Sequence, residues 1–362
     1  MEVKISVNKD NQISKGIIYI GQYGTSGYAS AAKGYLCYFY MHGIPISWEP
    51  LRFDSSDLNG DNYYNLIVKS LIDKKLEFCD TVILHSTPDL WNSMLNQNQD
   101  RFEGKRLIGY TVWETSKLPE SWVGYMNNSV HQIWCPSTYN KKVFEDSGVK
   151  PEVRVIPHIF LNQELLGRDR VELRTSTGEL VVNTGEYTFY NISELNARKG
   201  VDDLIRAYCG AFTVDDKVRL ILKVHYRDYS DKNKKYCINE ITKITRRFPN
   251  PPKIMYILDN LGDNGIMALH SIGDCYATLC KSEGFGLTIF DAFNYGKRII
   301  ATGYSGYVDF LGNDYPGLVK YKMGNVEGME EFSKNYTEDQ EWAIPNIEHA
   351  KELMRAQVDD KL

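Results

Sequence analysis

The sequence has 362 residues, a formal net charge of −5 and a hydrophobic fraction of 43%. A chain of this length exceeds what one hydrophobic core usually supports, so we expect two domains of roughly 150–200 residues each. The acidic balance excludes a uniformly basic surface that would hold a nucleic-acid backbone, and we expect no nucleic-acid partner.

The cysteines and the N-terminal residues indicate the compartment. Seven cysteines, with no C-x-x-C pair among them, lie mainly in apolar runs, where Cys packs as a small hydrophobe. The first residues lack the apolar stretch of a signal peptide, and no run of about 18 apolar residues follows. We therefore expect a cytoplasmic protein.

Residues 1–160 alternate predicted strands with predicted helices, which is typical of a Rossmann-like domain with a parallel sheet. Ser137 or Thr138 is expected to cap one of these helices, and Gly148 to end it. The predicted strands cover residues 17–20, 44–48, 81–84, 106–115, 132–135 and 153–158, and the predicted helices cover residues 30–41, 116–126 and 141–147.

A glycine-rich turn follows the first strand with the spacing G-x-x-G-x-x-G, at Gly21, Gly24 and Gly27. This spacing differs from the dinucleotide fingerprint G-x-G-x-x-G, although Glu49 stands about where a ribose-binding acid would. We favour a tight turn that leaves room for a ligand. A nucleotide-dependent dehydrogenase remains the alternative at this turn.

Two strands of this half end on residues that suit a ligand site. His85 follows the strand over residues 81–84, and Glu114 ends the next one. The carboxyl ends of strands in an open sheet line the usual ligand crevice, so both are candidates. A histidine that is merely hydrogen-bonded in a loop is the alternative for His85.

The alternation restarts after a polar stretch, residues 161–178, which we interpret as a linker. Residues 179–337 form a second predicted Rossmann-like domain, and residues 338–362 end in a helix expected to pack on the N-terminal domain. The predicted strands cover residues 179–183, 187–190, 218–224, 253–258, 275–280 and 298–301, and the predicted helices cover residues 201–212, 236–247 and 347–358.

In the second domain, residues 281–293 form a predicted glycine-rich loop and helix between the strands over residues 275–280 and 298–301. Glu283 and Asp291 are spaced there as E-x7-D. The backbone amides after Glu283 open a helix, a position that attracts phosphate. Arg198 and Lys199 precede another helix of this domain and suit a diphosphate that leaves with negative charge. The alternative for these two residues is a solvated pair of charges.

These motifs together carry a family resemblance. Residues 282–292 resemble the E-x7-E region of retaining glycosyltransferases of the GT-B fold, the family-4 type. Residues 198–208 resemble the K-G-x-x-x-L-I-x-A-F segment that binds the donor's diphosphate in that family. Residues 134–140, 155–158 and 26–29 are similar to strand ends and to the first glycine-rich loop of the acceptor domain.

The resemblance implies a GT-B fold, in which two Rossmann-like domains face each other across a central cleft. It implies that Glu283 meets the hydroxyls of the donor sugar, that Arg198 and Lys199 hold the diphosphate, and that Asp291 meets the ribose. His85 or Glu114 would then face the reacting sugar. Lys223, Gly284, Phe285, Gly286 and Leu287 complete the expected donor side, and Gly24, Ser26, Gly27 and Tyr28 the expected acceptor side.

Three departures from the family pattern bear on these roles. Asp291 replaces the second glutamate and is one methylene shorter, which weakens its expected contact with ribose. Ser193 and Glu194 stand where a Gly-Arg pair is usual, so Arg198 is expected to compensate. Glu114 follows Trp113 where many members have a histidine.

The reaction implied is transfer of a sugar from a UDP-, GDP- or dTDP-sugar to a glycan or glycoconjugate hydroxyl, with retention of configuration. No D-x-D occurs in the sequence, in agreement with a site that needs neither a metal nor another cofactor. A lysine-rich segment, residues 232–247, leaves membrane association open. The alternatives are an inverting transferase or a sugar-nucleotide epimerase, with Glu114 or His85 as the base, and a catalytically silent carbohydrate-binding module.

Overall fold

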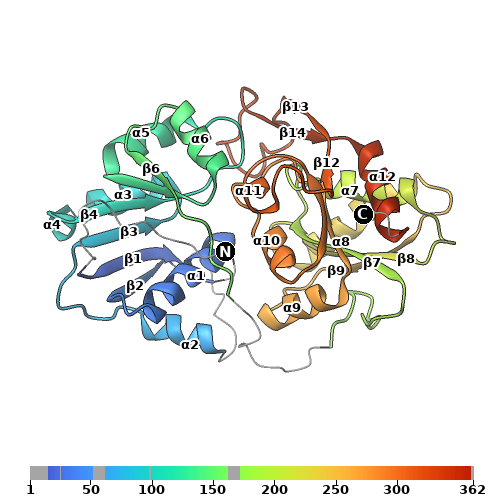
Figure 1. Cartoon of the computed structure of the whole chain (residues 1–362), viewed down its shortest axis with the longest axis horizontal. Coiled ribbons are helices and arrows are strands. Elements are labelled where there is room, and N and C mark those ends of the chain that lie inside the picture. The colour runs from blue at the N-terminus through green and yellow to red at the C-terminus, as the bar shows by residue number, and fades with distance from the viewer. Residues whose placement is uncertain (1–14, 25, 52–61, 98, 162–171, 360–362) are drawn as a thin grey trace. The chain divides into compact units, whose positions relative to one another are not determined.

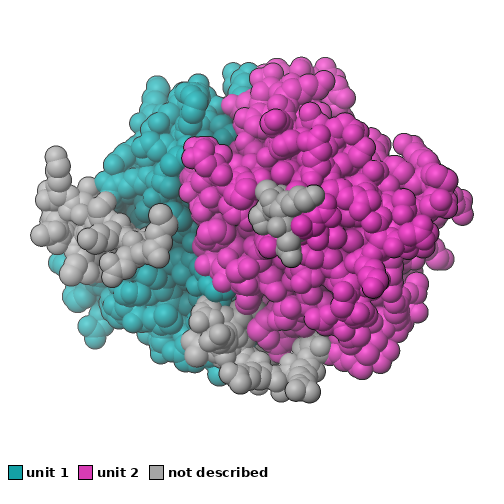
Figure 2. All heavy atoms as spheres, turned by 45° about the vertical axis from the view of Figure 1, so that its right-hand side comes forward, with its two compact units in different colours: residues 1–113, 117–167 teal, residues 114–116, 168–362 magenta. Residues whose placement is uncertain are grey.

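The computed structural model describes residues 15–24, 26–51, 62–97, 99–161 and 172–359, so most of the predicted linker lies outside the described residues. The chain forms two compact units, coloured separately in Figure 2. The N-terminal unit comprises residues 1–113 and 117–167, and the C-terminal unit comprises residues 114–116 and 168–362. The short segment 114–116 thus groups with the C-terminal unit.

The N-terminal unit is built on a six-stranded parallel sheet with the strand order β2-β1-β3-β4-β5-β6 (Figure 1). Parallel pairing requires crossover connections, which the helices supply. The strands are β1 Ile17–Gln22, β2 Ile46–Leu51, β3 Thr81–His85, β4 Arg106–Tyr110, β5 Gln132–Cys135 and β6 Glu152–Val155. The helices are α1 Gly27–Met41, α2 Tyr63–Ser70, α3 Pro88–Gln97, α4 Gln99–Phe102, α5 Glu120–Ser129 and α6 Thr138–Asp146.

The C-terminal unit contains a second six-stranded parallel sheet, with the order β12-β11-β10-β7-β8-β9, and an antiparallel hairpin of β13 and β14. The strands are β7 Tyr187–Glu194, β8 Val218–His225, β9 Lys253–Ile257, β10 Cys275–Thr278, β11 Arg298–Thr302, β12 Leu318–Val319, β13 Tyr321–Asn325 and β14 Glu341–Pro345. The helices are α7 Val201–Ala211, α8 Asp231–Thr245, α9 Asp263–Ile272, α10 Leu287–Asn294, α11 Val308–Leu311 and α12 Ile347–Val358.

Strand order in this second sheet reverses between β7 and β10, which pair directly. The chain builds outward from β7 through β8 to β9, then returns to β10 and builds in the other direction. Such a switch point leaves a crevice beyond the carboxyl ends of the two strands, and ligands of open α/β sheets bind there. The predicted pair of Rossmann-like sheets is confirmed.

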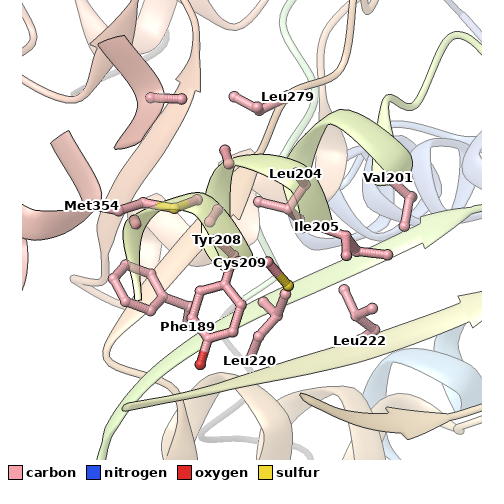
Figure 3. Packing of buried hydrophobic residues seen from close by; sticks show 14 of the residues in the cluster. Phe189, Val201, Leu204, Ile205, Tyr208, Cys209, Leu220, Leu222, Leu279 and Met354 are labelled. Atoms are coloured by element: carbon pink, nitrogen blue, oxygen red, sulfur yellow. The ribbon is translucent and has the colours of Figure 1, made fainter. Parts of the chain in front are cut away.

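Helix α7 is the best example of a helix specified by its hydrophobic period. Val201, Leu204, Ile205 and Tyr208 recur at helical spacing and are buried. Figure 3 shows them packed against Leu220 and Leu222 of β8. This core fixes where α7 begins, and with it the position of the loop that precedes the helix.

Two predictions about the C-terminal unit are corrected by the structure. Residues 179–183 form only one isolated bridge, Leu180 to Arg174, instead of a strand. Strand β7 runs on to Glu194 because it pairs along its whole length with β8. Helix α12 packs on α7 within its own unit, where Met354 joins the core, and its expected packing on the N-terminal domain stays a prediction (Figure 3).

Candidate functional site

Two loops meet at the switch point of the C-terminal sheet. One connects β7 to α7 and carries Arg198 and Lys199; the other connects β10 to α10 and carries Glu283. The amide of Lys281 donates a hydrogen bond of 2.8 Å to the carbonyl of Arg198, which ties the loops together. The structure therefore brings together three residues that the sequence predicted from two separate motifs.

Glycines at two positions permit this close approach of backbones. A Cβ added at Gly200, where φ is +58°, would lie 2.1 Å from the carbonyl oxygen of Leu279. A Cβ at Gly306 would lie 2.0 Å from the carbonyl oxygen of Gly284. Only glycine fits at either place without a shift of the backbone. A third loop, after β11, thus packs directly on the Glu283 loop.

Glu283 is the centre of an ion-pair cluster. Its Oε2 lies 2.9 Å from Nη1 of Arg198, and its Oε1 lies 2.5 Å from Nζ of Lys199. Arg198 also donates from Nη1 to the carbonyl of Ser282 at 2.9 Å. The Glu283 side chain is only 13% exposed, so these pairs are formed largely out of water. Charge-assisted bonds of this kind are stronger than neutral ones.

The cluster keeps Glu283 ionised. Burial by itself raises the pKa of a carboxyl, but the nearby Arg198 and Lys199 reverse this and bring the pKa of Glu283 down to about 2. The amide of Glu283 donates to Oγ of Ser305 at 2.9 Å, which holds the residue's backbone. A carboxylate that stays charged at neutral pH accepts hydrogen bonds and does not act as a general acid.

Arg198 is buried, with 8% of its surface exposed, and its guanidinium also faces Glu114. The Nη2 atom lies 3.6 Å from Oε1 of Glu114, and the hydroxyl of Tyr336 donates to Oε2 of Glu114 at 3.1 Å. Within the described residues, Nε of Arg198 has no hydrogen-bond partner. Glu114, predicted as a catalytic residue, is therefore placed as a partner of Arg198.

The remaining predicted donor residues surround this cluster on the same loops. Gly284, Phe285 and Gly286 lead into α10, which Leu287 begins. The first amides of any helix have no partner within it and point outward from its start. Asp291 lies further along α10 and is partly buried. Its expected contact with ribose stays a prediction.

Lys223 lies near the end of β8, next in the sheet to β7. Lys223 is only 3% exposed, and this burial lowers its pKa to about 8. Its ammonium group lies 4.9 Å from the centre of the Tyr229 ring, a cation–π contact. The structure places Lys223 near the carboxyl end of β8, as the predicted strand requires. Its role in donor binding stays a prediction.

The candidates in the N-terminal unit have local partners. His85 is buried at the end of β3 and is hydrogen-bonded through Nδ1 to the hydroxyl of Tyr19. Burial lowers the pKa of His85 well below its usual value, so the ring is neutral. This geometry agrees with the alternative of a hydrogen-bonded histidine, while a catalytic role stays a prediction.

The glycine-rich turn of the N-terminal unit opens α1. Ser26 caps this helix by accepting from the amide of Ala29 at 3.1 Å, and Gly27 is its first residue. Gly24 has a φ of +116°, and the hydroxyl of Tyr28 is 2.9 Å from Oγ1 of Thr111. These contacts explain the residues structurally, and their acceptor-side role stays a prediction.

Sequence reasoning missed Tyr336 and Ser305. Tyr336 lies in the connection between β13 and β14, far along the chain from Arg198, and no motif marks it. Ser305 follows β11 in a Gly-Tyr-Ser-Gly stretch with a φ of +77°. A polar residue between glycines after a predicted strand could have pointed to it.

Neither a metal-binding group of side chains nor a membrane-spanning helix is found among the described residues. Among the described residues, no three His, Cys, Asp or Glu side chains are grouped so as to hold a metal ion. Within the same part of the chain, the helices are all too short or too polar to cross a membrane.

Two Rossmann-like units with parallel sheets, the second with a carboxylate and cations at its switch point, define a protein of the GT-B fold. Residues 174–352, nearly the whole described C-terminal unit, match the sequence model of the family "Glycosyl transferases group 1". This region is therefore similar to the glycosyltransferase domains of that family, and the two units have the GT-B fold.

Solved structures of the same fold cover most of the chain. A trehalose-6-phosphate structure from E. coli, bound with UDP-2-fluoro glucose, is 10% identical and has a TM-score of 0.56, with 96% of each chain covered. WaaG, a glycosyltransferase involved in lipopolysaccharide biosynthesis, is also 10% identical with a TM-score of 0.56, over 95% of this chain and 90% of that one. At such identities the likeness concerns the fold.

One curated relative is similar in sequence. The alpha-monoglucosyldiacylglycerol synthase of Streptococcus pneumoniae is 23% identical over 213 residues, which cover 57% of this chain. The matched region spans 44% of that relative, less than half of its length.

Proposed function

We propose that this protein transfers a sugar from a nucleoside diphosphate sugar to an acceptor hydroxyl, with retention of configuration and without a metal ion. The observation that carries the proposal is the ion-pair cluster of Glu283, Arg198 and Lys199 at the switch point. The match to the family "Glycosyl transferases group 1" covers all three residues. The cluster offers both charges that such a donor requires: a carboxylate for sugar hydroxyls and cations for phosphates.

In this reaction the bond between the anomeric carbon and the diphosphate oxygen breaks, and a bond to the acceptor oxygen forms. The leaving diphosphate gains negative charge, which Arg198 and Lys199 would stabilise together with the amides at the start of α10. Because that charge is greater in the transition state than in the bound donor, these groups would contribute mainly to the rate. The leaving phosphate would take the proton of the acceptor hydroxyl.

Glu283 would accept hydrogen bonds from hydroxyls of the donor sugar. Its low pKa suits an acceptor and argues against a proton donor at neutral pH. Both of its oxygens already contact cations, so sugar hydroxyls would use the remaining lone pairs. Such a carboxylate would fix the sugar relative to the diphosphate.

The donor is proposed to be a UDP-hexose first, with GDP- and dTDP-sugars as further candidates. Support comes from the E. coli structure of the same fold, which holds UDP-2-fluoro glucose. The acceptor is proposed to be a glycan or glycoconjugate. The curated relative is named for a glucosylated diacylglycerol, which makes a lipid-linked acceptor worth including in the panel.

The test measures release of nucleoside diphosphate from UDP-, GDP- and dTDP-sugars by the full chain. Glu283→Gln and Lys199→Met should each lower kcat by about a hundredfold, because each removes a charge next to the reacting bond. Glu331→Gln and Lys243→Met are matched controls on exposed side chains and should match the wild type. Unchanged turnover in both site variants would show that the cluster is not the active site.

The product of the active donor then decides the stereochemistry. Proton NMR of the first product formed should show the anomeric configuration of the donor. The opposite configuration would establish an inverting transferase, and would return attention to Glu114 or His85 as a base.

A further inference from the structure

The excursion of residues 326–340 between β13 and β14 packs beside the candidate site. Its Val326 and Met329 are buried with Trp342, and Tyr336 and Ala197 pack against this small cluster. Ala197 directly precedes Arg198 in the chain. The excursion therefore supports the loop that carries the two cations of the site.

The end of the same excursion and the first residue of β14 hold the segment that carries Glu114. The amide of Ser116 donates to the carbonyl of Glu341 at 3.0 Å, and the amide of Glu341 donates to Oγ of Ser116 at 2.8 Å. The hydroxyl of Thr115 donates to Oε1 of Gln340 at 2.9 Å. The two residues that follow Glu114 are thus held by backbone and side-chain hydrogen bonds.

The side chains form a continuous line from Tyr336 to the proposed reacting centre. Tyr336 donates to Oε2 of Glu114, whose Oε1 faces Nη2 of Arg198, and Nη1 of Arg198 contacts Glu283. The separation of 3.6 Å between Glu114 and Arg198 is that of an ion pair without a hydrogen bond. The hydroxyl of Tyr336, at 3.1 Å, holds the other oxygen of Glu114, so the two contacts together bear on how this carboxylate lies.

We propose that Tyr336 is a positioning residue, which orients the Glu114 carboxylate so that Glu114 in turn orients the guanidinium of Arg198 toward the leaving group. This inference rests on the proposed function. Tyrosine suits the task because its hydroxyl is at the end of a rigid ring, and that ring is fixed by packing in the cluster of Val326, Met329 and Trp342. Tyr336 and Glu114 are not placed in contact with the substrate.

The orientation matters because Arg198 has two carboxylate neighbours that compete for it. Glu283 and Glu114 contact different nitrogens of the guanidinium, so together they set the direction of its plane. A guanidinium binds phosphate well only when its fork is aimed at the oxygens. Loss of one of these carboxylate contacts would leave the positive charge of Arg198 in place but weaken the alignment of its guanidinium.

Tyr336→Phe removes only the hydroxyl and keeps the ring that packs in the cluster. We expect kcat to fall about tenfold with KM changed by less than about twofold, since the lost hydrogen bond to a charged group acts on the leaving diphosphate. Tyr226→Phe is the matched control, because its hydroxyl donates to Glu331 of the same excursion at 3.3 Å. That variant should keep the wild-type kcat.

A double-mutant cycle separates positioning from mere support of the fold. In a Glu114→Gln background, Tyr336→Phe should change kcat by less than about twofold, because the link to Arg198 is already broken. Independent effects that simply add would overturn the inference, as would a wild-type kcat in Tyr336→Phe.

A structural readout keeps this test separate from the proposed function. If the wild type turns over no donor, the proposed function fails, and crystal structures of the wild type and of Tyr336→Phe still decide the positioning role. We expect Glu114 to turn and the guanidinium of Arg198 to move in the variant. An unchanged Glu114–Arg198–Glu283 arrangement would overturn the inference.

Discussion

At the scale of single residues, the site shows how a buried carboxylate stays charged. An ionised group out of water is stable only if it is paired and hydrogen-bonded. Glu283 has Arg198 on one oxygen and Lys199 on the other, and Ser305 fixes its backbone. Glu283 is therefore held as an anion.

This pairing predicts a pH dependence of stability. The pKa of Glu283 in the folded protein, about 2, is below its ordinary value of 4.5. Its contribution to stability is therefore present above pH 4.5 and is lost as the pH falls toward 2, by on the order of 3 kcal/mol in all. Urea unfolding from pH 7 to pH 3 should show the wild type losing its advantage over Glu283→Gln.

Glu331→Gln is the control for this titration, because the Glu331 side chain is 75% exposed. Its stability should follow that of the wild type at every pH. A difference between wild type and Glu283→Gln that stays constant down to pH 3 would contradict the proposed ion pairing.

At the scale of elements, the site depends on how closely its loops approach. Arg198 and Glu283 meet because β7 and β10 are neighbours in the sheet and because Gly200 lets one loop lie against the other. These are properties of the connection between strands, and no single helix or strand carries the site alone.

Gly200→Ala tests the close approach of these loops. The new Cβ would lie 2.1 Å from the Leu279 carbonyl oxygen, at a φ of +58° that disfavours alanine. We expect a loss of about 2–3 kcal/mol in the free energy of unfolding, measured by urea titration. Gly124→Ala, within α5, has nothing within 4 Å of the new atom and should not destabilise the protein. Equal effects of the two variants would contradict the argument.

Met354→Ala tests the packing of α12 on α7. The side chain is fully buried in the cluster around α7, so its removal should cost about 2–4 kcal/mol of unfolding free energy. Exposed Glu352 of the same helix gives the control, and Glu352→Ala should stay within about 0.5 kcal/mol of the wild type. A loss below about 1 kcal/mol for Met354→Ala would mean that α12 contributes little to this core.

At the scale of the whole molecule, each of the two units contains one six-stranded parallel sheet, and the two sheets differ in the order of their strands. The ion-pair cluster of Glu283, Arg198 and Lys199 lies in the C-terminal unit, where the order of the strands reverses. If the proposed function holds, electrostatic stabilisation of the leaving group comes from the chain itself.

Chelation of metal ions is the test at this scale. We expect nucleoside diphosphate release to be unchanged, within about twofold, after exhaustive dialysis against EDTA, because Arg198 and Lys199 supply the positive charge. Activity is measured with and without added Mg²⁺ and Mn²⁺. A loss on chelation that Mg²⁺ or Mn²⁺ restores would contradict metal independence.

Much of the architecture follows from local patterns in the sequence. Apolar runs and helical periods located most strands of both sheets, and α12 was predicted with its observed bounds. The cap of α6 was predicted at Ser137 or Thr138, because hydroxyls before a helical period satisfy the first amides, and the structure shows that it is Ser137. The hairpin of β13 and β14 and the true length of β7 were missed, since partners distant in the chain decide them.

The sequence by itself determined the two Rossmann-like sheets and the candidates Arg198, Lys199 and Glu283, because strand-end loops and glycine spacing are local signals. Only the tertiary structure decided that these three form one cluster, that Glu114 faces Arg198, and that Tyr336 holds Glu114. The physical reason is that ion pairs and side-chain hydrogen bonds depend on distances in space, which parallel-strand crossovers and loop packing set and which sequence separation does not encode.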